Sequence, residues 1–261
     1  MRRTHFYSFI TIVFISFFCV SCAKNAATEE VSAPLSEAEI RENVIKADES
    51  ASSRNDVAKI REAVKLLAKS RNLDNPNFEV EWKFAKFNYF LSKVSNDKNE
   101  IEKALKTGEN AGNTASRIEA QKPEGYFWYA ANLGEQAKRA PVTVGIGAID
   151  KIREAMTKVI EIQPDFQAGS AFDALGQLEL ETRMTSGTAE KAIEYLEKGL
   201  QYGKENSYLR LHLAQAYLVL KRNDEAKKHL EHILKIKPIA DFLPEHEESV
   251  KEAKRLLETR F

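Results

Sequence analysis

Few side chains in this sequence combine the residue type and spacing that catalysis or metal binding needs. His229 and His232 lie three residues apart, and His246 follows further along the chain. A metal site would need a third ligand and hydrogen-bonded support for each ligand, so we interpret the first two as a solvated pair on a charged helix. No Ser-His-Asp set or pair of catalytic carboxylates stands out. The sequence therefore predicts a non-enzyme without cofactor or metal.

The two cysteines, Cys19 and Cys22, lie near the N-terminus. They close an apolar run, residues 6–20, that has the layout of a secretory signal and is short for a membrane span of about 20 residues. The segment around Cys22 resembles the lipobox of bacterial lipoproteins, although Cys19 stands where Leu is usual. We therefore predict lipid on Cys22. The alternatives are an ordinary secretory signal, cleaved near Ser21 or Ala23, and a retained membrane anchor.

These features divide the chain into three parts: a signal peptide (1–21), a flexible lipid-anchored tether (22–35) and a repeat domain (36–261). The last part has no cysteine, which excludes disulfides and thiolate chemistry there. Basic and acidic residues number 39 each in the full chain, and loss of the signal would leave a slightly acidic protein. That balance argues against nucleic-acid binding, which needs clustered Lys and Arg.

Apolar residues recur with helical spacing almost throughout, as in Ile40, Val44 and Ala47. Residues 207–238 fit the tetratricopeptide (TPR) pattern of two helices in about 34 residues. Within them, Ala214 and Ala226 are small enough for two helices to cross closely. Similar pairs begin near Trp82, Phe127 and Phe172, a degenerate first pair covers 36–71, and a terminal helix covers 244–258.

We therefore predict an all-α fold, a TPR-like helical-repeat superhelix of about five helix pairs with a C-terminal capping helix. Such arrays bury apolar faces between neighbouring repeats and present a concave surface lined by the first helix of each pair. That surface is the expected binding site.

Aligning the repeats places three amides at one equivalent position of this surface, with other residues one turn earlier. The predicted groove residues are Phe87, Trp128, Asn132, Asp173, Gln177, Leu211 and Gln215. Amides both donate and accept hydrogen bonds, so this set is suited to an extended peptide or a small ligand. The alternative is that these are ordinary solvated groove residues. The peptide-carboxylate clamp of some TPR domains needs several Lys and Arg here, and only Lys83 is present.

Between the two helices of the pair that begins near Phe127 lies an uncharged apolar segment, residues 140–148. Exposed apolar segments often mark interfaces, so Val142, Val144 and Ile146 are predicted to form an interface loop. No Lys-Ser or Lys-Thr follows its glycines, which excludes a phosphate loop.

The segment Tyr126-Phe127-Trp128-Tyr129-Ala130-Ala131-Asn132-Leu133-Gly134 resembles the T-component family associated with TRAP transporters. The resemblance covers roughly residues 78–240. It implies a periplasmic lipoprotein with a degenerate TPR-like fold, a trimeric assembly, and docking to a periplasmic solute-binding protein or handling of an apolar solute.

Two hypotheses follow. The first is a lipid-anchored periplasmic accessory protein of a TRAP-type solute uptake system, a possible homotrimer that binds a protein or an apolar small ligand. The second is a general TPR protein–protein scaffold in cell-envelope assembly. Ala23, directly after the lipidated Cys, favours the outer membrane over the inner one.

Overall fold

The computed structural model describes residues 35–238 and 240–261. The chain divides into two units, Met1–Pro34 and Leu35–Phe261, and the second unit is described here by itself. The signal peptide and Cys22 lie outside the described residues, so export and lipidation stay predictions.

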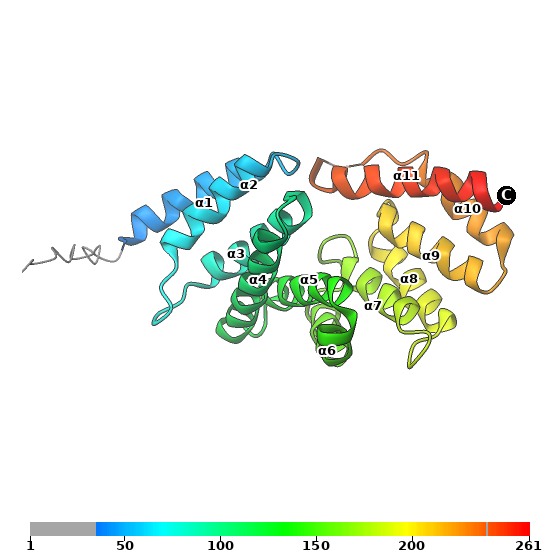
Figure 1. The fold of residues 1–261 in the computed structure, drawn as a ribbon, viewed down its shortest axis with the longest axis horizontal. Helices are drawn as coiled ribbons and strands as arrows, with labels where there is room; N and C mark the ends of the chain where they lie inside the picture. The colour runs from blue at the N-terminus through cyan, green and yellow to red at the C-terminus, as the bar shows by residue number, and fades with distance from the viewer. Residues whose placement is uncertain (1–34, 239) are drawn as a thin grey trace, which may run out of the picture. The chain divides into compact units, whose positions relative to one another are not determined.

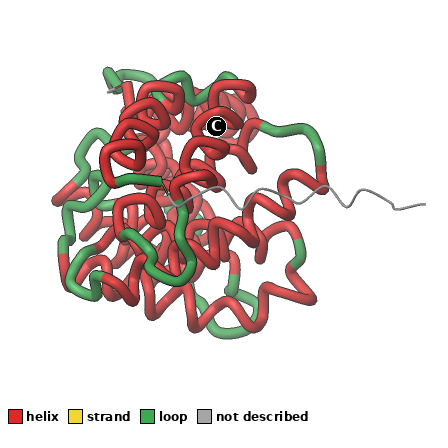
Figure 2. The backbone as a smooth tube through the Cα atoms, turned by 90° about the vertical axis from the view of Figure 1, so that its left-hand side faces the viewer, coloured by secondary structure: helices red, strands yellow, loops and turns green. Residues whose placement is uncertain are grey.

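The described part of the chain consists of helices and loops without a strand (Figure 2). The helices of the first half are α1 (Glu37–Ala51), α2 (Val57–Ser70), α3 (Phe78–Val94), α4 (Lys98–Ile118), α5 (Pro123–Arg139) and α6 (Ile146–Ile162). Those of the second half are α7 (Ser170–Glu181), α8 (Ala189–Tyr202), α9 (Ser207–Val219), α10 (Asn223–Ile233) and α11 (Leu243–Arg260). A π-helical turn, η1 (Pro141–Gly145), precedes α6, and a 3₁₀ turn, η2 (Ala240–Phe242), precedes α11.

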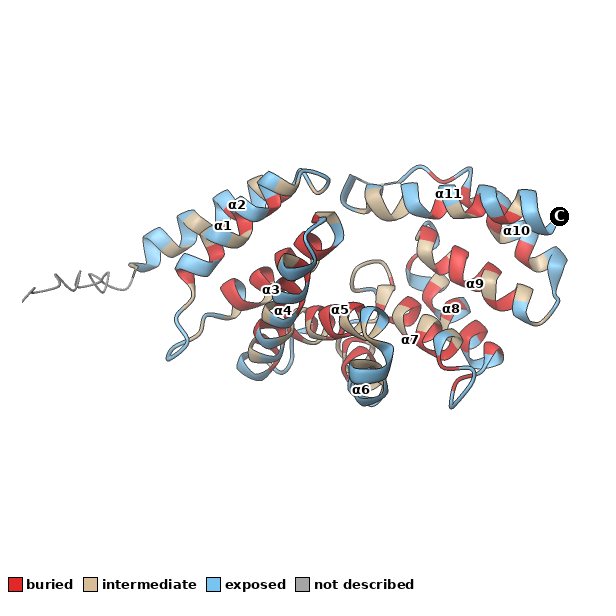
Figure 3. Ribbon diagram, in the orientation of Figure 1, coloured by how far each residue is buried: buried red, intermediate tan, exposed pale blue. Residues whose placement is uncertain are grey.

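Consecutive helices pack as five pairs, α1/α2 to α9/α10, and α11 packs on the last pair (Figure 1). Buried residues gather where the helices meet, and exposed residues cover the outer faces (Figure 3). The predicted all-α superhelix with a capping helix is confirmed. Among the described helices, none combines the length and apolar character that crossing a bilayer requires.

The helix starts are encoded locally by capping residues. Ser36 and Glu39 form a reciprocal capping box at the start of α1. Asp56, Asn77 and Asn206 accept hydrogen bonds from backbone N–H groups in the first turns of α2, α3 and α9. Each cap satisfies donors that have no partner within the helix.

Small residues stand where helices cross most closely. Ala214 and Ala226 are fully buried, in line with their predicted role. A Cβ added at Gly176 would lie 2.5 Å from Leu196 Cγ, so no larger residue fits there without a shift of α8. The short TPR-like side chains thus set the spacing between α7 and α8.

The apolar segment before α6 is not the loop that the sequence suggested. Gly145 N donates to Ala140 O at 3.2 Å, which closes a π-helical turn that leads directly into α6. Val142 and Ile146 are 83% and 77% exposed, and Val144 is half-buried. The predicted loop is therefore wrong as a backbone conformation, because residues 141–145 form a π-helical turn and Ile146 begins α6. The role of Val142, Val144 and Ile146 at an interface stays a prediction.

Candidate binding cavity

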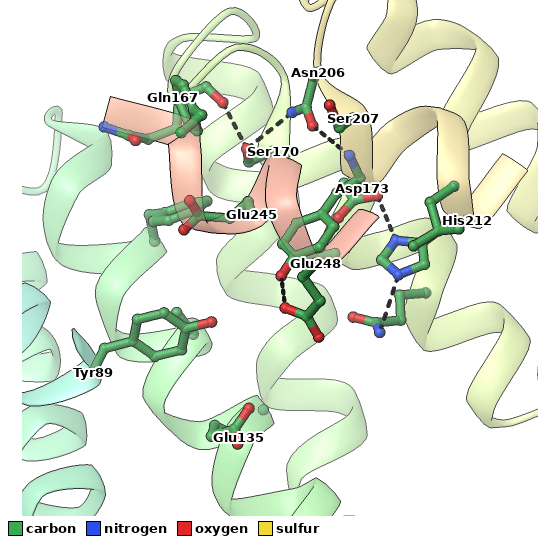
Figure 4. Close-up of a pocket in the computed structure, with 18 of the residues that line it drawn as sticks. Tyr89, Glu135, Gln167, Ser170, Asp173, Asn206, Ser207, His212, Glu245 and Glu248 are labelled. Carbon is green, nitrogen blue, oxygen red and sulfur yellow. Dashed lines mark hydrogen bonds and ion pairs between the residues drawn. The ribbon is translucent and has the colours of Figure 1, made fainter. Parts of the chain in front are cut away.

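The inner faces of the repeats enclose a cavity of about 1890 Å³. Its walls come from the α1–α2 turn, the first helices α3, α5, α7 and α9, and from η2 and α11, with further contributions from η1, α6 and the α8–α9 turn. Figure 4 shows part of this wall, with side chains from α3, α5, α7, α9 and α11 pointing toward the same space. The first helix of each pair from α3 onward thus lines the concave side.

Most of the predicted groove residues lie in this wall. The cavity is lined by Phe87, Trp128, Asp173, Gln177, Leu211 and Gln215. Four of these are buried, and the two glutamines are half-buried. Whether these side chains contact a ligand stays a prediction.

Asn132 does not line the cavity, and its predicted place in the groove is wrong. Its side chain is fully buried, and its Nδ2 donates to the backbone oxygens of Ala85 and Trp128 at 3.1 and 2.7 Å. A Cβ on Gly108 of α4 would lie 2.3 Å from Asn132 Oδ1. Asn132 therefore packs between α3 and α4, where Gly108 makes room for it.

A register shift of α5 explains this difference. The cavity side of α7 includes Ala174 and Gln177, and the corresponding wall residues of α5 are Ala131 and Gly134. Gln177 is therefore matched by Gly134, two residues beyond Asn132. The alignment of α7 with α9 was right, because Gln177 and Gln215 both face the cavity.

One end of the cavity, formed by α7, α9 and α11, is polar, and we call it the polar end. Asp173 Oδ1 lies 2.7 Å from His212 Nδ1, and Gln177 Nε2 lies 3.4 Å from His212 Nε2 (Figure 4). With the proton of the neutral ring on Nδ1, the imidazole donates to Asp173 and accepts from Gln177. Lys138 of α5 donates to Gln177 Oε1 at 3.0 Å, so this set is satisfied internally.

Two further polar pairs join α9 to α11. Ser207 Oγ lies 2.7 Å from His246 Nδ1, and the Tyr208 hydroxyl donates to Glu248. The pKa of Tyr208 is raised above its usual range, mainly because the hydroxyl is buried and also because it donates a hydrogen bond to Glu248. These contacts hold the capping helix against the cavity wall.

The turn before α7 has an unusual backbone. Gln167, Ala168 and Gly169 have φ values of 49°, 53° and 73°, in the left-handed region that residues other than glycine seldom adopt. Asn206 Nδ2 donates to Ala168 O at 3.0 Å. The turn places Gln167 and Ala168 in the cavity wall.

The opposite end, formed by α3, α5 and the α1–α2 turn, is aromatic, and we call it the aromatic end. The Trp128 ring packs against Tyr89, Phe90 and Phe127, with ring centroids 5.8, 5.7 and 5.0 Å apart. Trp128 is 4% exposed, and its Nε1 has no hydrogen-bond acceptor among the described residues.

Two cations lie against these rings. The Arg54 guanidinium is 4.0 Å from the Phe90 centroid, and Lys86 Nζ is 5.5 Å from the same centroid. Arg54 also donates to Glu245 Oε2 at 2.9 Å and to the backbone oxygen of Asp241. It thereby joins the first inter-helix turn to the last helix.

The sequence interpretation missed Arg54, Lys86, Tyr89, His212 and Glu245. Helical spacing could have found two of them, since Lys86 and Tyr89 share one face of α3 with Phe90. The contact between Arg54 and Glu245 spans 191 residues of the chain and leaves no local pattern.

The histidines on α10 are not a simple solvated pair. His229 is half-buried and stacks on Tyr217 at a centroid distance of 5.7 Å. Burial lowers the pKa of His229 to about 4. Within residues 35–238 and 240–261, no three His, Cys, Asp or Glu side chains are grouped so as to hold a metal ion.

Comparison with protein families gives two matches. Residues 45–181 match a family described as regulator of microtubule dynamics protein 1-3. Residues 183–239 match a family of tetratricopeptide repeats. No curated protein matches this chain.

Comparison with solved structures identifies similar folds. A thermophilic TPR protein of Thermus thermophilus is similar with a TM-score of 0.59 and 14% identity, over 81% of this chain and 98% of that one. A mutant of the protein MamA gives a TM-score of 0.48 and 15% identity, over 76% and 98%. The first of these supports a TPR-type fold.

Proposed function

Since the chain belongs to the family of regulator of microtubule dynamics proteins 1-3, we propose that it is a helical-repeat scaffold that binds a partner protein through its concave cavity. TPR-type repeats mediate protein–protein interactions, and such folds typically act without catalysis. The family is described as regulating microtubule dynamics. The cavity supports one part of such a role, namely the binding of another protein.

The observation that carries this proposal is the size and wall of the cavity. Small-ligand pockets usually measure about 300–1,000 Å³, whereas this cavity measures about 1890 Å³ and is lined by α3, α5, α7, α9 and α11. The half-buried amide of Gln215 can donate to a peptide carbonyl and accept from a peptide N–H, and Gln177 keeps one N–H and one oxygen lone pair beyond its contacts with His212 and Lys138. An extended segment of a partner fits these features better than a small solute does.

A paired substitution on α9 tests this proposal. Gln215 faces the cavity, whereas Val219, one turn later, is 40% exposed and lies outside the cavity wall. Peptides that bind the full chain are first selected from a synthetic library. We expect Gln215→Arg to weaken their binding at least tenfold in fluorescence anisotropy, while Val219→Arg leaves it unchanged. Equal effects of the two variants, or a library without a binder, would contradict cavity binding.

We also propose that the chain is exported and anchored by lipid on Cys22, on the periplasmic side and at the outer membrane. The support is the pair of basic residues Arg2 and Arg3, the apolar run of residues 6–20 and Cys22 two residues after it. Metabolic labelling with palmitate should mark the wild type and not Cys22→Ser. Labelling of both proteins would contradict this anchor.

The narrower role, as an accessory of TRAP-type uptake, rests on the aromatic-Ala-Ala-Asn-Leu-Gly segment. In that segment Ala130 and Asn132 are buried in the core, so the resemblance supports a shared helix packing more than a shared partner. Native mass spectrometry of the full chain distinguishes the accessory role from that of a general scaffold. A trimer would support this role, and a monomer would leave the general scaffold.

A further inference from the structure

We propose that the aromatic end of the cavity recognises a carboxylate on the bound peptide, with Lys86 Nζ and Trp128 Nε1 as its donors. The proposal rests on the proposed function, because it names the chemistry of the peptide received by the same cavity. The positions differ from the TPR clamp that the sequence argued against, since Lys86 lies in a different place on α3 from Lys83.

Lys86 is a half-buried cation that lacks a counter-ion among the described residues. Among the described residues, no carboxylate oxygen lies within 4.0 Å of its Nζ. The amine is instead surrounded by the rings of Trp82, Phe87, Phe90 and Trp128, at 5.5 to 6.0 Å from their centroids. Burial lowers the pKa of Lys86, as expected for a charge that loses water without gaining a partner.

The carboxylates around Lys86 are mostly engaged with other cations. Asp48 accepts from Lys83 at 2.6 Å. Glu245 is paired with Arg54, and Glu135 with Arg139 and Lys93 at 3.0 and 3.5 Å.

Of the charged groups that act on Lys86, Asp241 and Asp48 raise its pKa, and Arg54 and Lys83 lower it. The exposed Asp241 has no ion pair among the described side chains. It is therefore the group that competes with a ligand carboxylate.

Trp128 provides the second donor. Its Nε1 is buried without an acceptor among the described residues, and indole is a donor only. Leaving such a group unpaired is unfavourable, and a ligand acceptor can relieve that cost. Lys86 Nζ is 5.8 Å from the Trp128 centroid. One ligand carboxylate can therefore lie close to both side chains.

The aromatic rings around Lys86 determine which kind of peptide side chain can lie next to the carboxylate. Phe87, Tyr89 and Phe90 line the cavity beside Lys86, so an apolar side chain next to the acidic group would be buried there. The far end of the cavity carries Asp173, His212 and Gln177, which suit a peptide backbone and not an aliphatic tail. The occupant is thus a peptide with a carboxylate, at its C-terminus or on a side chain, beside an apolar residue.

The test uses the full chain and a paired library of synthetic heptapeptides. Every peptide with a free C-terminal carboxylate has an amidated twin, and every peptide with an internal Glu has a Gln twin. Binding is measured for the wild type, Lys86→Met, Asp241→Asn and Lys138→Met. Met keeps the length and apolar stem of Lys, and Lys138 is a cavity lysine at the polar end.

We expect the carboxylate forms to bind the wild type at least tenfold more tightly than their twins. Lys86→Met should reduce that ratio to near one, Lys138→Met should preserve it, and Asp241→Asn should increase it. The two kinds of twin show whether a chain terminus or an acidic side chain supplies the carboxylate. Thermal melting confirms that each variant is folded.

The outcomes separate this proposal from the proposed function. Peptides that bind equally well as acids and amides, yet lose binding in Gln215→Arg, would overturn carboxylate recognition and leave the scaffold function standing. A carboxylate preference that persists in Lys86→Met would overturn the role of this site. If no peptide binds but decanoate does so in a Lys86-dependent way, both proposals fail and the occupant is an apolar acid.

Discussion

The two ends of the cavity use polar groups in opposite ways. At the polar end, Asp173, His212 and Gln177 are hydrogen-bonded to one another. At the aromatic end, Lys86 has no carboxylate and Trp128 Nε1 no acceptor within the described part of the chain. Paired groups stabilise the fold, whereas unpaired groups leave free energy that a ligand can recover. From this difference we expect the aromatic end to determine which ligand the cavity binds.

The largest expected effect comes from removing the centre of the aromatic end. Trp128→Ala should lower the free energy of unfolding by about 3–5 kcal/mol, because it leaves a cavity among Tyr89, Phe90 and Phe127. Gln177→Ala at the polar end should cost less than about 1 kcal/mol. Urea unfolding measures both values. Similar losses of free energy of unfolding in the two variants would contradict the proposed difference between the two ends.

The second largest effect on stability is expected at the ion pair between Arg54 and Glu245, which joins the α1–α2 turn to α11. Arg54→Ala leaves Glu245 without its cation, and both side chains are mostly buried, at 17% and 23% exposure. We expect a loss of about 2 kcal/mol in the free energy of unfolding. Arg255→Ala on α11 is the control, because its partner Glu252 and Arg255 itself are more exposed, and it should cost about 0.5 kcal/mol or less.

The C-terminal repeat should be sensitive to acid through His229. Burial lowers its pKa to about 4, so below about pH 6.5 the unfolded chain binds a proton that the folded chain does not. Stability should therefore fall as the pH drops from about 6.5 to 4, by about 1 kcal/mol after allowance for partial exposure. Urea unfolding at pH 7 and pH 4.5 should show a smaller loss for His229→Phe than for the wild type.

Lys86→Met is expected to stabilise the protein, in contrast to the substitutions above. Because burial opposes the charge of Lys86, an apolar side chain of similar length should raise the free energy of unfolding by about 1 kcal/mol. Lys138→Met should change it little, since that amine reaches Gln177 at the exposed rim. A destabilised Lys86→Met would show that the cation already has a partner.

The smallest effect is expected at the turn before α7. Ala168→Gly relieves a left-handed backbone with φ of 53° and should stabilise the protein by about 0.5–1 kcal/mol. Ala174→Gly, within α7, should instead cost about 1 kcal/mol. A loss at both positions in thermal unfolding would show that Ala168 is not strained.

Local patterns in the sequence specify the helices and their order. Helical spacing, capping residues such as Ser36 and Asn77, and small residues such as Ala214 and Ala226 act within one helix or one pair. Their information is local, so the five pairs and the capping helix could be predicted.

The packing of the repeats specifies which helix faces meet and which side chains line the cavity. Each residue turns a helix face by about 100°, so the register shift of two residues on α5 moved Asn132 from the predicted groove into the core. Arg54 and Glu245 meet across 191 residues, and Lys86 has no ion pair among the described residues, where Asp48, Glu245 and Glu135 contact other cations. Such contacts depend on the packing of whole repeats, and no short stretch of sequence specifies them.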